Sequence, residues 1–371
     1  QRQMCIRDSF IDITVEKNAK IYVAGHRGLV GSAIWNNLLQ RGYTNLVGRT
    51  HKELDLLDGV AVKKFFDEEK PDAVILAAAH VGGIMANSIY RADFIYNNLQ
   101  IQQNVIGESF RHGVKKLLFL GSTCIYPRDA EQPMKEEVLL TSPLEYTNEP
   151  YAIAKIAGLK MCESFNLQYG TNYIAVMPTN LYGPNDNFDL ERSHVLPAMI
   201  RKIHLAKCLM NGDMEAVRAD LKKRPVEGVD GNSPEADIIA ILAKYGIHND
   251  HVMLWGSGKP MREFLWSEEM ADASVHVLLN VDFKDTYKEG DKDIRNCHIN
   301  VGTGKELSIH DVAMLIKKEI GFEGEIRWDA SKPDGTMRKL TDVTKLHNLG
   351  WHHKVEIDEG VHRMYKWYTE Q

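Results

Sequence analysis

A tyrosine and a lysine four residues apart provide a proton donor and a cation that can act on one carbonyl oxygen. Tyr151 and Lys155 share one face of a predicted helix at this spacing. Ser122, which follows a predicted strand, adds a hydroxyl that can hydrogen-bond the same oxygen. Because the unperturbed pKa of tyrosine is about 10, we expect the charges of Lys155 and of a nicotinamide to lower the pKa of Tyr151. The set predicts reduction of a ketone, in which Tyr151 protonates the oxygen as hydride arrives.

A glycine-rich turn lies between a predicted strand and a predicted helix. The turn, Gly25-His26-Arg27-Gly28-Leu29-Val30-Gly31, follows the apolar run 21–24 and opens the helical spacing of 29–41. Glycines there allow a tight turn and let backbone N–H groups approach a pyrophosphate closely. The turn therefore predicts a dinucleotide site, and the alternative is that the glycines serve the turn alone.

The residues after the second predicted strand bear on which dinucleotide binds. An NAD site usually has an acid there, but this chain has Gly48-Arg49-Thr50-His51-Lys52, and Arg27 lies in the glycine turn. Cations at these positions favour the 2′-phosphate of NADP(H). The alternative is that the side chains are only solvated and that the cofactor is NAD.

Strands and helices alternate over the first half of the chain. Apolar runs predict strands at 21–24, 46–47, 73–79, 117–120 and 173–177, and helical spacing predicts helices at 29–41, 60–69, 93–111 and 151–169. Strands that are apolar on both faces and separated by helices predict a parallel sheet covered on both sides. We therefore expect an α/β fold with a Rossmann-like doubly wound parallel sheet, which binds ligands at its carboxyl edge.

The length of 371 residues corresponds to two domains plus some extra chain, at about 150 residues per domain. We expect residues 1–18 to be a leader outside the fold, and residues 19–181 to form the NADP-binding domain, with returns near 267–301. Segments 182–266 and 302–371 are expected to form a smaller C-terminal α/β substrate-binding domain. It includes a helical insertion at about 208–251, with helices over 214–223 and 234–245, and Ser233 is the expected N-cap of the second.

The composition excludes several classes of protein. With a net charge of −6 and no local basic patch, the chain is not expected to bind nucleic acid. Its longest apolar run, 73–79, is far shorter than the ~20 residues that a membrane-spanning helix needs. Five widely spaced cysteines without a Cys-x-x-Cys pair indicate neither a disulfide framework nor a metal site, and they favour a reducing cytoplasm. A small-molecule substrate fits best.

Longer segments around these residues resemble the extended short-chain dehydrogenase/reductases that act on nucleotide sugars. The matching segments are 25–31, 81–84, 120–127, 148–155, 177–184, 255–258, 261–264 and 329–335. Within that family they are similar to enzymes that convert GDP-4-keto-6-deoxy-D-mannose to GDP-L-fucose with NADPH. The resemblance implies epimerisation at C3 and C5 followed by hydride delivery to C4. It also implies a homodimer formed through the helices that contain Asp93 and Tyr151.

The resemblance further implies roles for individual residues. Cys124 is the implied base and His194 the implied acid of the epimerisation; from the residues alone, Cys124 is equally a small core residue and His194 a loop histidine. The implied substrate-binding residues are Lys202 and Arg262 on the diphosphate, Trp255 near the nucleotide and Asp334 on the ribose. By itself, Arg262 is equally able to pair with Glu263 or with another surface acid. The implied cofactor-binding residues are Gly25, His26, Arg27, Gly28, Leu29, Val30, Gly31, His51, Lys52, Leu120, Gly121, Ser122, Thr123, Lys155, Pro178, Thr179, Asn180, Leu181 and His194.

Three positions depart from the pattern of the family. His51 stands where an Arg is expected, Thr123 where a Ser is common, and Lys202 where an Arg is expected. The alternative functions are those of another nucleotide-sugar 4-reductase, an epimerase or a 4,6-dehydratase. A dehydratase is expected to carry Asp-Glu where Thr123-Cys124 stands. A non-catalytic NADP-binding protein is the other alternative, and it has no reason to retain the serine, tyrosine, lysine and cysteine together.

Overall fold

The computed structural model describes residues 14–332 and 334–371, which divide into two compact units. The first unit contains the residues up to Leu181 together with Glu263–Lys305 and Leu340–Lys354. The second contains Tyr182–Arg262, Glu306–Lys339 and Val355–Gln371.

A six-stranded sheet forms the centre of the first unit. In spatial order its strands are β10 (Ile299–Val301), β5 (Asn172–Pro178), β4 (Lys116–Leu120), β3 (Ala73–Leu76), β1 (Ile21–Ala24) and β2 (Leu46–Val47). Every neighbouring pair is parallel. The doubly wound parallel sheet predicted from the sequence is confirmed.

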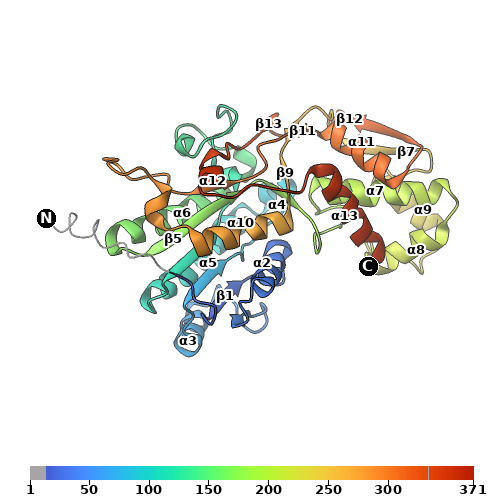
Figure 1. The fold of residues 1–371 in the computed structure, drawn as a ribbon. Helices are drawn as coiled ribbons and strands as arrows, with labels where there is room; N and C mark the ends of the chain where they lie inside the picture. The colour runs from blue at the N-terminus through green and yellow to red at the C-terminus, as the bar shows by residue number, and fades with distance from the viewer. Residues whose placement is uncertain (1–13, 333) are drawn as a thin grey trace. The chain divides into compact units, whose positions relative to one another are not determined.

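Alternate residues of the strands enter hydrophobic cores on opposite faces of this sheet. Ile21 and Val23 of β1 belong to one core, whereas Tyr22 and Ala24 belong to the other. The first core is covered by α2 (Leu29–Gln40) and α10 (Ser267–Asn280), which lie side by side although they are far apart in the sequence (Figure 1). The second is covered by α3 (Gly59–Glu69), α5 (Arg91–Arg111) and α6 (Glu149–Tyr169). Burial on both faces explains why these strands are continuously apolar.

Shorter elements complete the first unit. They are α4 (Ile84–Ile89), β6 (Asn180–Tyr182), whose last residue belongs to the second unit, β9 (Phe264–Trp266), which pairs with β6, and α12 (Thr344–Asn348). The segment 340–354 was expected in the second domain. It belongs instead with the sheet, because Leu346 and Trp351 are buried in the core beneath α2 and α10.

Part of the expected leader belongs to the core of the first unit. Residues 1–13 lie outside the described residues. Val15, however, is buried, and its carbonyl oxygen accepts a hydrogen bond of 3.2 Å from the Tyr43 hydroxyl. Ala19 is buried in the same core. The fold therefore begins before residue 19.

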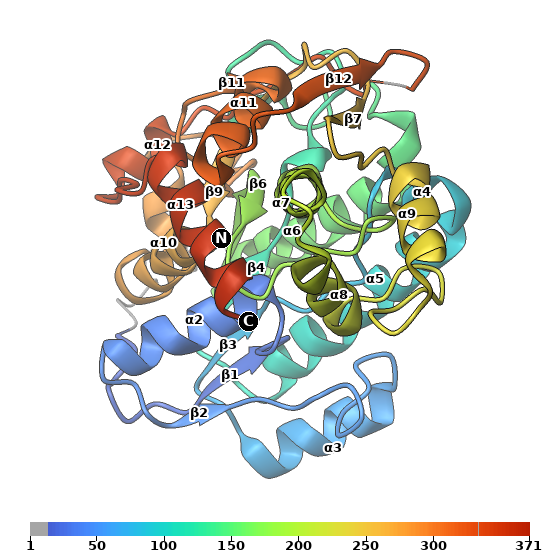
Figure 2. The same ribbon diagram turned by 90° about the vertical axis from the view of Figure 1, so that its right-hand side faces the viewer.

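The second unit combines helices with two small sheets (Figure 2). Its helices are α7 (Val195–Met210), α8 (Met214–Lys223), α9 (Glu235–Lys244), α11 (Ile309–Ile320) and α13 (Ile357–Glu370). Strand β7 (His251–Trp255) pairs in parallel with β12 (Glu325–Asp329). Strand β8 (Met261–Arg262) lies between β11 (Leu307–Ser308) and β13 (Arg338–Lys339).

The expected insertion contains the two helices that the sequence predicted, α8 and α9. The apolar stripe of α9 is buried at Ile238, Ile241 and Leu242. The predicted N-cap is wrong: Pro234 occupies that position, while the Ser233 hydroxyl accepts from the backbone N–H of Asp230 at 3.0 Å. The proline already has the extended ψ that a cap requires, so the helix begins one residue later than predicted. None of the helices in the described ranges has the length and apolar character needed to cross a bilayer.

Candidate active site

The glycine turn joins β1 to α2, and its backbone is tightly packed at Gly25 and Gly31 but not at Gly28. Gly25 has a φ of +86°, and a Cβ there would lie 2.8 Å from the backbone nitrogen of Ala78. A Cβ on Gly31 would lie 2.0 Å from the carbonyl oxygen of Gly25. A Cβ on Gly28 would meet only that oxygen, at an ordinary 3.5 Å. Gly25 and Gly31 are therefore needed for close packing, and Gly28 begins α2 without a side-chain cap or an acid in the first turn. The N-terminal end of α2 therefore fits a pyrophosphate.

The cations predicted to surround the adenosine phosphate differ in whether another side chain already pairs with them. Arg27 is exposed and makes no hydrogen bond or ion pair with the described residues. Arg49 is paired with Glu69 at 2.5 Å. His51 is exposed, with Nδ1 3.7 Å from a carboxylate oxygen of Asp55, and Lys52 is also exposed. Arg27 and Lys52 are the cations here that remain available to a phosphate.

The His26 ring lies over Gly48, where a Cβ would clash with it at 2.5 Å. It also packs against Trp35 of α2, with ring centroids 5.4 Å apart. Burial, followed by the charge of Arg27, lowers the pKa of His26, and its buried Nδ1 has no hydrogen-bond partner among the described residues. That atom is a polar group still available to a ligand. The remaining turn residues, Leu29 and Val30, are half-buried at the start of α2.

The carboxyl end of β4 holds Ser122 and Cys124 in one short turn. Gly121 donates its N–H to the carbonyl oxygen of Val176 in the neighbouring strand at 2.8 Å. The Ser122 hydroxyl accepts from the backbone N–H of Cys124 at 3.3 Å and caps the single 3₁₀ turn that follows. Thr123 and Cys124 are buried, whereas Ser122 is half-buried. The local turn therefore places the predicted hydroxyl and thiol two residues apart at this edge.

Lys155 ties α6 to the end of β4. Its side chain is buried, and Nζ donates to the carbonyl oxygen of Leu120 at 2.8 Å. The same Nζ lies 5.7 Å from the centre of the Tyr151 ring. The spacing of four residues predicted from the sequence thus does bring the lysine and the tyrosine together. Burial lowers the pKa of Lys155 to about 8, while negative charge on Cys124 opposes this shift.

Burial dominates the titration of Tyr151 in the protein alone. It raises the pKa of the phenol well above the usual value, and negative charge on Cys124 raises it further. This direction is opposite to the lowering expected from the sequence, because burial desolvates the phenolate. Proton transfer by Tyr151 would need additional charge from bound ligands to lower this pKa.

Two residues that the sequence reasoning missed support Tyr151 on α6. Phe94 of α5 is buried and meets the Tyr151 ring edge to face, with centroids 6.2 Å apart. Asn98, one turn further along α5, donates from its amide to the carbonyl oxygens of Phe94 and His80 at 2.7 and 2.9 Å. The helical spacing of 94 and 98 indicated a buried face but not what that face contacts.

The segment 178–181 begins with the last residue of β5 and runs into β6, beside the turn that follows β4. Thr179 donates its N–H to Val301 of β10 at 3.0 Å, and its hydroxyl donates to the backbone oxygen of Glu263 at 3.3 Å. The Asn180 amide donates to the same oxygen at 2.8 Å. These residues lie in the first unit with Ser122, Tyr151 and Lys155.

The predicted acid and the first substrate cation belong to α7 of the second unit. His194 is the N-cap residue of α7 and is exposed. Lys202 lies two turns along the helix and is buried, and no described acceptor satisfies its ammonium. Burial lowers the pKa of Lys202 to about 8. A buried cation without an acceptor fits an anionic ligand.

The other substrate-side residues cluster around the end of β7. Trp255 is 61% exposed, and the ammonium of Lys332 lies 5.5 Å from its ring centre. Arg262 donates to the backbone oxygen of Met261 at 2.8 Å, and burial lowers its pKa while Asp334 opposes the shift. Asp334 accepts from the backbone N–H and the hydroxyl of Ser257 at 2.6 and 2.8 Å. The sequence did not predict the contact between Lys332 and Trp255, because it depends on the course of the chain after β12 and not on a local pattern.

Glu263 provides no partner for Arg262, contrary to the alternative left open by the sequence. Its carboxylate is buried and accepts from Thr303 and Thr341 at 2.6 and 3.0 Å through their backbone N–H groups. No sequence pattern signals this role, because the donors lie far along the chain.

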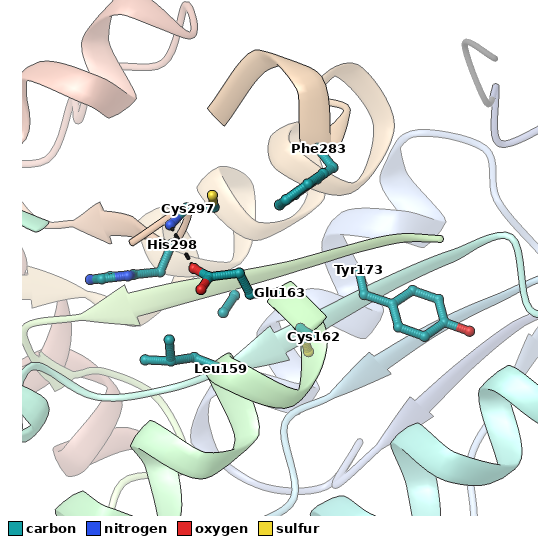
Figure 3. A pocket seen from close by; sticks show the side chains of 8 residues that line it. Leu159, Cys162, Glu163, Tyr173, Phe283, Cys297 and His298 are labelled. Carbon is teal, nitrogen blue, oxygen red and sulfur yellow. Dashed lines mark hydrogen bonds between the residues drawn. The ribbon is translucent and has the colours of Figure 1, made fainter. Parts of the chain in front are cut away.

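A small cavity elsewhere in the first unit contains none of the predicted site residues (Figure 3). It lies beside α6 and is lined by Leu159, Cys162, Glu163, Tyr173, Ala175, Phe283, Cys297 and His298. The Glu163 carboxylate is already engaged, with Lys160 at 2.8 Å and the N–H of Cys297 at 3.3 Å. The chemistry predicted from the sequence is therefore not located here.

Comparison with known proteins agrees with this geometry. A model of the NAD dependent epimerase/dehydratase family matches residues 21–220. The chain is 50% identical to GDP-L-fucose synthase 1 of Arabidopsis thaliana over 96% of this chain and 94% of that one. It is 48% identical to GDP-L-fucose synthase of Escherichia coli K12 over 95% and 97% of the two chains.

A solved structure extends the comparison to an enzyme that was studied together with a dinucleotide. A GDP-D-glycero-L-gluco-heptose synthase from Campylobacter jejuni, determined in the presence of NADPH, is 46% identical to this chain. The two superpose with a TM-score of 0.88 over 96% of this chain and 99% of that one. The similarity therefore spans both units and includes enzymes of GDP-sugars with different names.

Proposed function

Because the chain belongs to the NAD dependent epimerase/dehydratase family and is a relative of GDP-L-fucose synthases, we propose that it converts GDP-4-keto-6-deoxy-D-mannose to GDP-L-fucose. The observation that carries the proposal is the grouping of Ser122, Cys124, Tyr151 and Lys155 at the carboxyl edge of β4 and the start of α6. This edge is where doubly wound sheets bind ligands.

The C4 ketone of the substrate makes one site sufficient for both parts of the reaction. It acidifies the protons on C3 and C5, and removal of either proton places negative charge on the ketone oxygen. In the proposal, the hydroxyls of Ser122 and Tyr151 stabilise that charge by hydrogen bonds. Cys124 removes each proton, and His194 returns a proton to the opposite face, so each inversion leaves the oxidation state unchanged.

Reduction then uses the same hydroxyls. NADPH, when bound, supplies the hydride for C4. Tyr151 donates its proton to the oxygen, and the ammonium of Lys155, held by the carbonyl of Leu120, stabilises the phenolate that remains. The glycine turn holds the pyrophosphate, and Arg27, His26 and Lys52 provide the polar and cationic groups for the 2′-phosphate, which supports NADP(H) over NAD(H).

For the substrate, Lys202 and Arg262 are proposed to bind the diphosphate. Both have a pKa lowered by burial, and a diphosphate would offset the cost of burying them. The exposed ring of Trp255 provides a surface for the base, and Asp334 accepts from the ribose. As Asp334 already binds Ser257, ribose binding requires it to share or exchange that partner.

The second candidate function is reduction of a related GDP-4-keto sugar without epimerisation. The observation that favours it is the 45% identity to a GDP-mannoheptose C4 reductase from Campylobacter jejuni. Reduction needs Ser122, Tyr151 and Lys155, whereas epimerisation also needs a base such as Cys124. The two functions therefore differ in what Cys124 does.

One assay separates the two functions. NADPH oxidation is followed with GDP-4-keto-6-deoxy-D-mannose in deuterated water, and the product is analysed for stereochemistry and deuterium at C3 and C5. We expect GDP-L-fucose labelled at both carbons. A C4-reduced product that retains both hydrogens would contradict epimerisation. Cys124→Ser should reduce the labelling by about 100-fold with unchanged NADPH affinity, and unchanged labelling would exclude Cys124 as the base.

We also propose a cytoplasmic homodimer. Tyr96 on α5 and Ile153 on α6 expose 66% and 42% of their surface, and these two helices pack against each other. An exposed apolar face on a helix pair suits an isologous contact. Sedimentation equilibrium should give twice the chain mass, and Tyr96→Glu should shift the distribution toward monomer. A wild-type monomer at micromolar concentration would contradict the proposal.

A further inference from the structure

Glu263 is a fully buried carboxylate surrounded by donors from distant parts of the chain. One oxygen accepts from the backbone N–H groups of Thr303 and Gly304 at 2.6 and 2.8 Å. The other accepts from the N–H and the hydroxyl of Thr341 at 3.0 and 2.6 Å. A Cβ on Gly302 would lie 2.2 Å from this carboxylate. The surrounding backbone is therefore shaped to enclose a charged group, whose burial is costly unless it is fully hydrogen-bonded.

The donors lie where the chain leaves or enters the first unit. The chain passes between the units after residues 181, 262, 305, 339 and 354. Glu263 itself follows the second passage, Thr303 and Gly304 precede the third, and Thr341 follows the fourth. The single carboxylate thus connects three of these segments within the first unit.

The backbone oxygen of Glu263 adds the segment before the first passage. It accepts from the Asn180 amide at 2.8 Å and from the Thr179 hydroxyl at 3.3 Å. Residues 178–181 follow β5, next to the turn that carries Ser122. The residue before Glu263 in the chain is Arg262. Any displacement of this backbone therefore moves groups proposed to face the nicotinamide and the diphosphate.

We propose that Glu263 is a positioning residue that fixes the 178–181 segment and the start of the Arg262 backbone to one rigid anchor. This inference rests on the proposed function, in which 178–181 line the nicotinamide side. Glu263 touches neither ligand. It acts on residues 178–181 through the segments of the first unit that it joins, and on Arg262 through the chain, because the two residues are consecutive.

Glu263→Gln tests the proposal with almost no change in volume. A carboxamide accepts through one oxygen only, so its NH2 group must face either the N–H pair of Thr303 and Gly304 or the N–H of Thr341. The variant therefore loses the hydrogen bonds from the backbone N–H groups on one of these two sides. We expect NADPH to bind within about threefold of the wild-type affinity, since the glycine turn is untouched. The fluorescence enhancement of the bound nicotinamide should fall, and kcat should fall by about 10- to 100-fold with a rise in KM for the GDP-sugar.

Glu136→Gln is the matched control. Glu136 is another buried carboxyl in the same unit; besides its own backbone N–H it accepts one from a distant segment, that of Asn300 at 2.9 Å, and burial raises its pKa. A carboxamide can keep that bond, so NADPH fluorescence, kcat and KM should stay near wild type. If Glu263→Gln and Glu136→Gln lower thermal stability equally and neither changes the nicotinamide signal, Glu263 is only a structural residue and the proposal is wrong.

Thr341→Val provides a second, milder variant in case Glu263→Gln does not fold. It removes the hydroxyl donor but leaves the N–H that binds the same oxygen. The nicotinamide signal should fall in the same direction, by a smaller amount, and an unchanged signal would overturn the proposal. The fluorescence measurement needs no GDP-sugar, so it remains decisive for Glu263 even if the wild-type enzyme acts on a different substrate.

Discussion

Two buried lysines show how the two units of this protein prepare for different ligands. Lys155 in the first unit donates to a backbone carbonyl, whereas Lys202 in the second has no described acceptor. Burial lowers the pKa of each to about 8. The first lysine is part of a finished arrangement that supports Tyr151. The second is a cation that we propose is satisfied by the diphosphate of the substrate, so that binding energy is used where the protein itself leaves a charge unsatisfied.

The largest effect on activity is expected for a substitution of Tyr151, which lies beside Lys155 in the first unit. Tyr151→Phe removes the proton donor but keeps the ring contact with Phe94. We expect the rate of NADPH oxidation to fall by about 100- to 10,000-fold, with unchanged NADPH affinity. Deuterium exchange at C3 and C5 should slow by a smaller factor, because Ser122 still hydrogen-bonds the enolate oxygen. Reduction at the parent rate would exclude Tyr151 as the proton donor, and unchanged exchange would show that its hydroxyl does not stabilise the enolate.

The finished arrangement is also the part that sequence reasoning predicted best. The strand β4 follows from a continuous apolar run, and the helix α6 with its pair of Tyr151 and Lys155 follows from helical spacing. The titration of Tyr151 did not, because desolvation depends on how the whole unit encloses the ring. Local pattern thus predicts which groups meet, and three-dimensional burial decides their charge.

The second unit was harder to predict because its contacts join distant segments. Sequence patterns predicted two helices in the insertion but no role for them. In the structure, Arg201 of α7 is fully buried and paired with Asp220 of α8 at 2.8 Å. Asp220 also accepts from the hydroxyl of Tyr368 in α13 at 2.6 Å. The insertion therefore braces the helix that carries Lys202, a role that no local pattern encodes.

Asp220→Asn tests this brace and has the second largest expected effect. It leaves the Arg201 guanidinium buried without its counter-charge, which should lower the free energy of unfolding by about 3–5 kcal/mol. Denaturant unfolding measures the loss. Asp237→Asn, on the exposed face of α9, is the control and should change stability by less than about 0.5 kcal/mol. Equal effects of the two substitutions would show that α8 does not brace α7.

Lys202→Met tests whether the ammonium of Lys202 binds the substrate, in contrast to that of Lys155. The methionine fills a similar volume but cannot bind an anion. We expect the KM for the GDP-sugar to rise by about 10- to 100-fold, with unchanged NADPH affinity and unchanged nicotinamide fluorescence. Lys222→Met, at an exposed position of α8, should leave KM unchanged. A normal KM in the Lys202 variant would remove this lysine from the substrate site.

The smallest effect, and the most diagnostic for the pair of lysines, is on the pH profile. The pKa of each lysine lies near 8, below the usual 10.4 of lysine, so each loses its charge as the pH rises through about 8. In the proposed mechanism the protonated forms bind the diphosphate and stabilise the phenolate, so kcat/KM should decrease above that pH, with a limiting slope of about −2 on logarithmic axes.

In Lys202→Met only Lys155 still titrates in this range, and the slope should become about −1. A slope that stays near −2 would mean that Lys202 does not titrate in the free enzyme. A flat profile would mean that neither lysine needs its charge for turnover. Because the two ammonium groups respond to pH through different partners, this one measurement separates the charge that the protein satisfies from the charge left for the substrate.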